Sequence, residues 1–88
     1  MLSINDWLAL YPNPNTRKSY KRALRRYIEH IYAIPNGRRT TDYNGLSIRY
    51  LEGTRDLRED LRGFAVFLNR FAPKTATLYF TGVLLWLE

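Results

Sequence analysis

A run of basic side chains between residues 16 and 40 is the strongest chemical feature of this sequence. It holds eight arginines and lysines and a single acid, Glu29, a local charge of +7, whereas the whole chain carries +6. The rest of the chain is therefore close to neutral. Such a concentration of one sign produces a positive field that attracts polyanions, the first feature expected of a nucleic-acid-binding domain. A merely solvated helix face normally mixes acids among its bases.

The spacing of residues in this run predicts a helix with one apolar and one basic face. At about 100° per residue, five apolar side chains form a stripe: Tyr20, Leu24, Tyr27, Ile28 and Ile31. Six polar side chains lie opposite it, flanked by Arg17 and Lys21: Asn15, Lys18, Ser19, Arg22, Arg25 and Arg26. Basic groups neutralise phosphates, and Asn, Ser or Arg reach base edges in a major groove. A membrane-surface or calmodulin-type use would need the apolar stripe, which the core requires.

A second, smaller polar patch follows Pro73 and consists of Lys74, Thr75 and Thr77. Proline is favoured at the first position of a helix, so these residues are expected in a first turn, where free N–H groups attract anions. Pro-Lys-Thr is a common helix opening, and the patch gains meaning only beside the basic helix.

The sequence lacks the residues that enzymes and metal sites need. It has no cysteine and one histidine, His30, which we expect on the surface, so no metal or cofactor is predicted. Glu59 and Asp60 are adjacent on a predicted helix and point in different directions, as expected for a face that forms salt bridges with Arg55, Arg58 and Arg62. We therefore predict no catalysis.

Helical periodicity and its breaks predict an all-α fold of four helices in one domain, residues 1–88. The helices are expected at residues 3–11, capped by Ser3, at 15–33, capped by Asn15 or Thr16, at 54–71, capped by Thr54, and at 73–88. Residues 35–53 lose the period and hold several turn residues, so they predict a long irregular connection. Such a loop is functional, partly ordered or an insertion, and the sequence does not choose among these.

The last predicted helix is apolar on most of its circumference. We expect eight residues in the core, namely Tyr20, Leu24, Tyr27, Leu61, Phe64, Leu68, Phe80 and Val83. Leu85 and Trp86 fall outside that face and are expected to be exposed, covered in a longer protein by its next element, or by self-association. The start of the chain lacks a signal-peptide pattern and no apolar run reaches the ~20 residues of a membrane span, which favours a cytoplasmic protein without a membrane role.

Taken together, these motifs resemble a known family. Thr16, Tyr20, Leu24 and Tyr27 in a basic helix, a leucine-rich helix, and Pro73-Lys74-Thr75 opening a last helix look like the core-binding domain of phage integrases and other tyrosine recombinases. The resemblance covers nearly the whole chain. It implies a SAM-like four-helix bundle that binds one face of a recombination site.

The resemblance also implies site residues and partners. The second and fourth helices would face double-stranded DNA with ten residues: Asn15, Thr16, Lys18, Ser19, Arg22, Arg25, Arg26, Lys74, Thr75 and Thr77. The other implied partners are a C-terminal catalytic domain of the same chain, which would hold the nucleophilic tyrosine, and further recombinase protomers on the DNA. The long 35–53 segment, and Ala72 where many members have a serine cap, depart from the family pattern.

Two other functions remain open from the sequence. In a free-standing helix-turn-helix regulator the last two helices would form the motif, but the recognition helix would then be the apolar one. In a SAM-like protein-interaction module, the exposed apolar surface of the last helix would bind a partner. Salt-dependent affinity for duplex DNA separates the two DNA-binding functions from the protein-interaction module.

Overall fold

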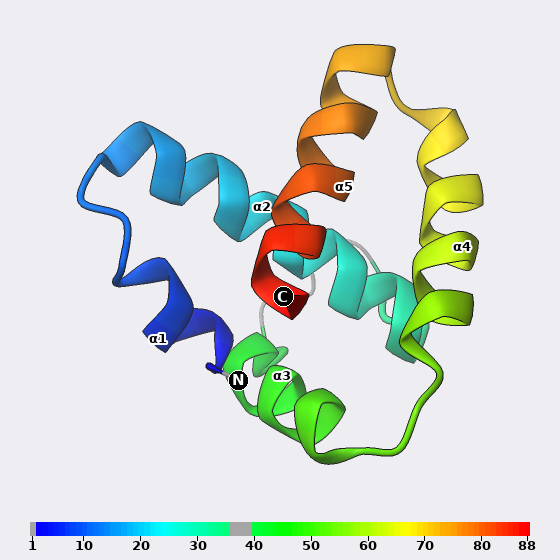
Figure 1. Cartoon of the computed structure of the whole chain (residues 1–88), viewed down its shortest axis with the longest axis horizontal. Coiled ribbons are helices and arrows are strands. Elements are labelled where there is room, and N and C mark those ends of the chain that lie inside the picture. The colour runs from blue at the N-terminus through cyan, green and yellow to red at the C-terminus, as the bar shows by residue number, and fades with distance from the viewer. Residues whose placement is uncertain (1, 36–39) are drawn as a thin grey trace.

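The computed structural model describes residues 2–35 and 40–88, and this part of the chain is all helical, as predicted. Figure 1 shows the helices arranged around α2, which α5 crosses near the centre. The described residues form five α-helices and one 3-10 turn, in the order α1 (Ile4–Leu8), α2 (Pro14–Tyr32), α3 (Tyr43–Glu52), α4 (Leu57–Phe67), η1 (Leu68–Arg70) and α5 (Pro73–Leu87). The prediction of four helices is wrong by one.

Local side-chain caps begin the first two helices. Ser3 caps α1 as predicted, accepting a hydrogen bond from the Asp6 N–H at 3.3 Å. The cap of α2 is Asn13, two residues before the earlier of the two predicted positions, because its side chain accepts from the N–H groups of Asn15 at 2.9 Å and Thr16 at 3.4 Å. Pro14 then occupies the first turn, where its missing N–H costs nothing. The helix ends at Ala33, whose φ of 54° is left-handed.

The prediction of an irregular connection at residues 35–53 is wrong for residues 43–52, which form helix α3. Asp42 caps it by accepting from the Gly45 N–H at 2.9 Å, and a Cβ on Gly45 would lie 2.3 Å from the Asp42 carboxylate. The glycine that indicated a turn is therefore part of the cap. Tertiary bonds hold the helix: Ser47 Oγ accepts from the Ile4 N–H at 3.1 Å and Asn44 from the Asn5 N–H at 2.9 Å.

The last two helices are joined by a tight turn. Asp56, and not Thr54, caps α4 by accepting from the N–H groups of Arg58 and Glu59. The α-helix ends at Phe67 and continues as η1, so the predicted helix to residue 71 is too long. Pro73 opens α5 as predicted.

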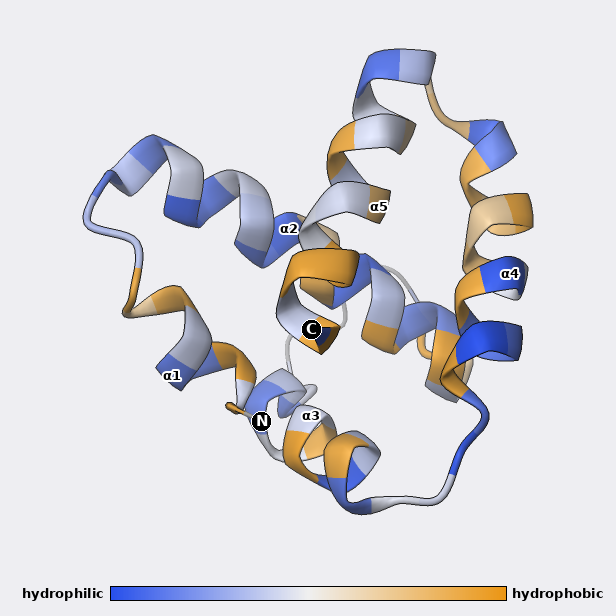
Figure 2. Ribbon diagram, in the orientation of Figure 1, coloured by the Kyte–Doolittle hydropathy of each residue, from blue (hydrophilic) through white to orange (hydrophobic). Residues whose placement is uncertain are grey.

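The predicted core is confirmed in its main residues. Five of the eight predicted side chains are buried, namely Leu24, Tyr27, Phe64, Leu68 and Val83, and the other three are half-buried against them. Figure 2 shows hydrophilic residues along α2 and at the start of α4, with apolar residues in the last turns of α5. The apolar stripe of α2 faces the interior, where Leu24, Tyr27 and Ile28 are fully buried, and its basic side faces outward, where Lys18 and Arg22 are exposed.

Helix α5 packs more completely than its sequence indicated. Trp86, expected to be exposed, is only 2% exposed, and its indole N–H donates to the Leu2 carbonyl at 2.9 Å, which closes the chain ends together. Leu85 is 37% exposed, as expected. Gly82 lies at the crossing with α2, where a Cβ would meet Ala23 Cβ and Tyr20 Cδ1 at 3.1 Å. The two helices can approach this closely because position 82 has no side chain.

Candidate nucleic-acid interface

The first half of α2 presents a basic surface without acidic partners. Lys18, Lys21, Arg22 and Arg25 are exposed, and within residues 2–35 and 40–88 none of them forms an ion pair. Arg17 is fixed differently, since its guanidinium donates to the Tyr11 carbonyl at 3.0 and 3.1 Å. It secures the turn between α1 and α2 and contributes its charge beside the others.

A groove lies in the angle between α2 and α5 and brings together residues from both. It is lined by Asn15, Thr16, Ser19 and Tyr20 of α2 and by Leu78 of α5. We call it the corner groove. Thr16 and Ser19 are half-buried in it, whereas Asn15 is exposed at its rim. Sequence reasoning missed Leu78, which is 39% exposed and lies one turn after Lys74; that spacing of four was the available signal.

The first turn of α5 has the predicted patch at its surface. Lys74 and Thr77 are exposed and Thr75 is half-buried. The N-cap residue Ala72 offers no side-chain hydrogen bond, so the first N–H groups of the helix stay available to an external acceptor. An anion such as a phosphate is favoured at that end.

The second half of the basic face is packed against other elements. The Arg25 guanidinium lies 5.0 Å from the centre of the Tyr43 ring. Arg26 lies 3.7 Å from the Glu29 carboxylate and 5.4 Å from the centre of the Phe71 ring. Glu29 is itself buried, and Tyr43 OH donates a hydrogen bond to its carboxylate at 2.6 Å. The predicted DNA-facing residues of α2 therefore divide into an open group at the start of the helix, an exposed Arg25 that lies beside Tyr43, and a half-buried Arg26. Arg38 and Arg39, which were expected to add to the basic charge, lie outside the described residues.

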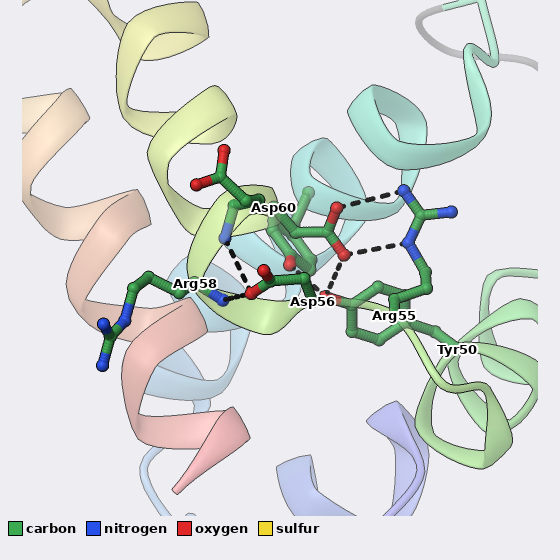
Figure 3. Close-up of polar contacts among 7 residues, drawn as sticks. Tyr50, Arg55, Asp56, Arg58 and Asp60 are labelled. Atoms are coloured by element: carbon green, nitrogen blue, oxygen red, sulfur yellow. Dashed lines mark hydrogen bonds and ion pairs between the residues drawn. The ribbon is translucent and has the colours of Figure 1, made fainter.

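A partly buried polar network joins α2, α3 and α4 behind this surface (Figure 3). Tyr27 OH and Tyr50 OH share a hydrogen bond, Tyr50 OH donates to Asp60 at 2.9 Å, and Arg55 binds both Asp60 oxygens at 2.9 and 3.0 Å. The hydrogen bonds from Arg55 hold the pKa of Asp60 below its usual value, and burial raises the pKa of Tyr27 to about 12. The charge of the Asp60 carboxylate is neutralised by Arg55 within the network, so the network adds little negative field at the surface of the protein.

Two further titratable groups, Glu59 of α4 and His30 of α2, also contact neighbouring side chains. Glu59 pairs with Arg62 at 3.2 Å, which confirms a salt bridge predicted on that face. His30 is half-buried, 5.0 Å from the ring centre of Phe67, and burial lowers its pKa. The expected surface position of His30 is therefore met only in part. Among the residues described, no three His, Asp or Glu side chains cluster as a metal site would require, and no helix is long and apolar enough to cross a membrane.

Comparisons with known proteins leave the family open. No family model matches the chain, and neither a curated protein nor a solved structure matches it significantly.

Proposed function

We propose that this chain is a DNA-binding domain that uses the outer face of α2 and the first turn of α5. The observation that carries the proposal is the set of exposed α2 cations without acidic partners, next to the hydrogen-bonding groups of the corner groove. The surface around α4 differs, because there Arg62 pairs with Glu59 and Arg55 pairs with Asp60. An unbalanced row beside polar groups suits a polyanion.

The two halves of this surface have different roles in the proposed complex. Lys18, Lys21 and Arg22 neutralise phosphates along the backbone, while Asn15 at the helix start reaches base edges. Lys74 and the uncapped N–H groups of α5 hold a phosphate on the far side of the corner groove. Leu78 between them offers an apolar contact for a thymine methyl or a sugar.

Within this class we propose the role of the core-binding clamp of a phage-type integrase, with a SAM-like arrangement. The support is the resemblance of α2 and of the Pro73-Lys74-Thr75 opening, together with DNA-facing residues that the resemblance and the exposed charges select in common. Catalysis would reside in another domain. As half of a clamp, the chain would bind DNA weakly, because the other half supplies further phosphate contacts.

Charge reversal at single positions tests this surface. We expect Arg22→Glu and Lys74→Glu each to weaken binding to a duplex at least about tenfold, since each removes a phosphate contact and adds repulsion. With about five phosphates neutralised, log affinity should fall against log salt with a slope of roughly −4 to −5, and each variant should flatten it by about one. Fluorescence anisotropy at several salt concentrations measures both quantities.

Arg58→Glu is the matched control, because Arg58 is exposed, lies on α4 and forms no ion pair among the described residues. It changes net charge equally and places an acid at a helix start, where acids stabilise. The affinity of Arg58→Glu for duplex DNA should stay within about twofold of that of the parent chain, because this change alters only the long-range electrostatic field. Equal losses for all three variants would reduce the proposal to nonspecific attraction, and unchanged binding by Arg22→Glu and Lys74→Glu would eliminate the surface.

A second candidate function is protein interaction through α5, favoured by the exposed leucines Leu78, Leu84 and Leu85, each 37–39% exposed. The same leucines disfavour a helix-turn-helix regulator that reads bases with α5, because its exposed face has few polar groups beyond the first turn. A protein-interaction module would show no salt-dependent affinity for duplex DNA.

A further inference from the structure

A second pocket lies apart from the corner groove, where the last half of α2 meets the end of α4 and the turn before α5. It has a volume of about 310 Å³ and is lined by Arg26, Glu29, His30, Ile34, Phe67, Arg70 and Phe71. We call it the arginine–phenylalanine pocket. Its size is at the lower end of the ~300–1,000 Å³ typical of small-molecule sites.

Flat groups make the walls of this pocket. The Arg70 guanidinium lies 4.4 Å from the centre of the Phe67 ring, and the Arg26 guanidinium lies 5.4 Å from that of Phe71. The His30 ring is 5.0 Å from Phe67, tilted by 36°, and Phe67 meets Phe71 edge to face at 5.7 Å. These contacts hold the two guanidinium groups against aromatic rings, so they present flat, cationic surfaces to a ligand.

The charges of the pocket leave an excess of positive charge. Among the described residues that line it, Glu29 is the only acid, and this carboxylate is already bound by Arg26 at 3.7 Å and by Tyr43 OH at 2.6 Å. Arg70 is exposed and forms no ion pair within residues 2–35 and 40–88. An anionic group can therefore be held by Arg70 without displacing a carboxylate.

We propose that the arginine–phenylalanine pocket binds a nucleotide. Nucleobases stack on guanidinium planes and on aromatic rings, and such stacking tolerates different bases. The phosphate would pair with Arg70, which can bind two of its oxygens at once. The same chemistry is present in a free mononucleotide and in an unpaired base of a DNA strand, and the latter source alone rests on the proposed DNA binding.

Binding of mononucleotides to the isolated 88-residue chain tests the pocket. Titration of the ¹⁵N-labelled chain with AMP, adenosine or inorganic phosphate should show amide shifts around Phe67 and Arg70 with AMP, and at least about tenfold weaker binding for either half alone. Arg70→Gln should weaken AMP binding about tenfold. Arg58→Gln, the same change on the exposed face of α4, should leave it unchanged. Unchanged amide shifts would show that the Arg70→Gln variant keeps the fold.

A second arm separates the two sources. A duplex with one unpaired nucleotide should bind more tightly than a perfect duplex, and Arg70→Gln should remove that difference while leaving perfect-duplex affinity nearly the same. Arg22→Glu should weaken both duplexes without affecting AMP, so failure of the proposed function and failure of the pocket are distinguishable. The pocket proposal is overturned if neither AMP nor the unpaired nucleotide depends on Arg70, or if inorganic phosphate binds as well as AMP.

Discussion

Removal of the Tyr50 hydroxyl should destabilise the fold more than removal of the hydroxyl of Tyr27, its hydrogen-bond partner. Tyr50 is 2% exposed, and its hydroxyl lies between Tyr27 OH and the Asp60 carboxylate. An ionised carboxylate only accepts, so Tyr50 OH donates its hydrogen bond to Asp60 and accepts one from Tyr27 OH. Tyr50→Phe therefore removes two hydrogen bonds and leaves the fully buried Tyr27 hydroxyl without an acceptor.

The sizes follow from these partners. Tyr27→Phe removes one neutral hydrogen bond while Tyr50 keeps Asp60, a loss of about 1 kcal/mol in the free energy of unfolding. Tyr50→Phe should cost about 2–4 kcal/mol, since it also removes a bond to a charged group and strands a buried donor. In the Tyr50→Phe background, Tyr27→Phe should be neutral or stabilising because it removes that stranded donor.

Urea unfolding followed by far-ultraviolet circular dichroism gives the four free energies of this double-mutant cycle. The slope of free energy against urea should be the same in all four proteins if the native packing persists. In the Tyr50→Phe background, we expect the loss of unfolding free energy caused by Tyr27→Phe to disappear or to become a gain. Equal costs of Tyr27→Phe in both backgrounds would refute the chain of hydrogen bonds from Tyr27 through Tyr50 to Asp60.

Three further changes are expected to alter stability. Because the pKa of Asp60 is lowered in the folded state, its contribution to stability is present above about pH 4 and is lost as pH falls through the folded pKa; Asp60→Asn should flatten that acid dependence in urea titrations between roughly pH 2 and 6. Leu24→Ala, at a fully buried position, should cost roughly 2–5 kcal/mol by the same assay, and a loss well below 1 would contradict the orientation of α2. Gly82→Val should cost at least about 1–3 kcal/mol, because its side chain would meet Ala23 and Tyr20 at the crossing of α2 and α5; a melting temperature equal to that of the parent would show that these helices separate easily.

The sequence by itself determined the elements whose signals are local. Pro73 opens α5 and Ser3 caps α1 where expected, because a proline ring and a serine hydroxyl act within one turn of chain. The apolar spacing of α2 identified its buried face, with Leu24 and Tyr27 fully buried. The same winding selected the outward cations Lys18 and Arg22, which are exposed.

Helix α3 is an element that only the tertiary structure decided. Its ten residues include Asn44 and Gly45, which favour turns, and short isolated helices are marginal in water. The helix is held by contacts distant in sequence, from Ser47 to Ile4 and from Asn44 to Asn5. No sequence pattern within residues 35–53 indicates that the helix binds Ile4 and Asn5.

The tertiary structure also decided which charges and apolar groups are available. Trp86 is buried against Tyr27 and Tyr50, and the Leu2 carbonyl, at the other end of the chain, accepts its N–H. Arg26 and Lys18 belong to the same predicted face, yet Lys18 is exposed while Arg26 packs against Phe71 from the turn before α5. Periodicity gives the direction of a side chain from its own helix, whereas exposure depends on which other elements lie in that direction, and those are brought there only by folding of the whole chain.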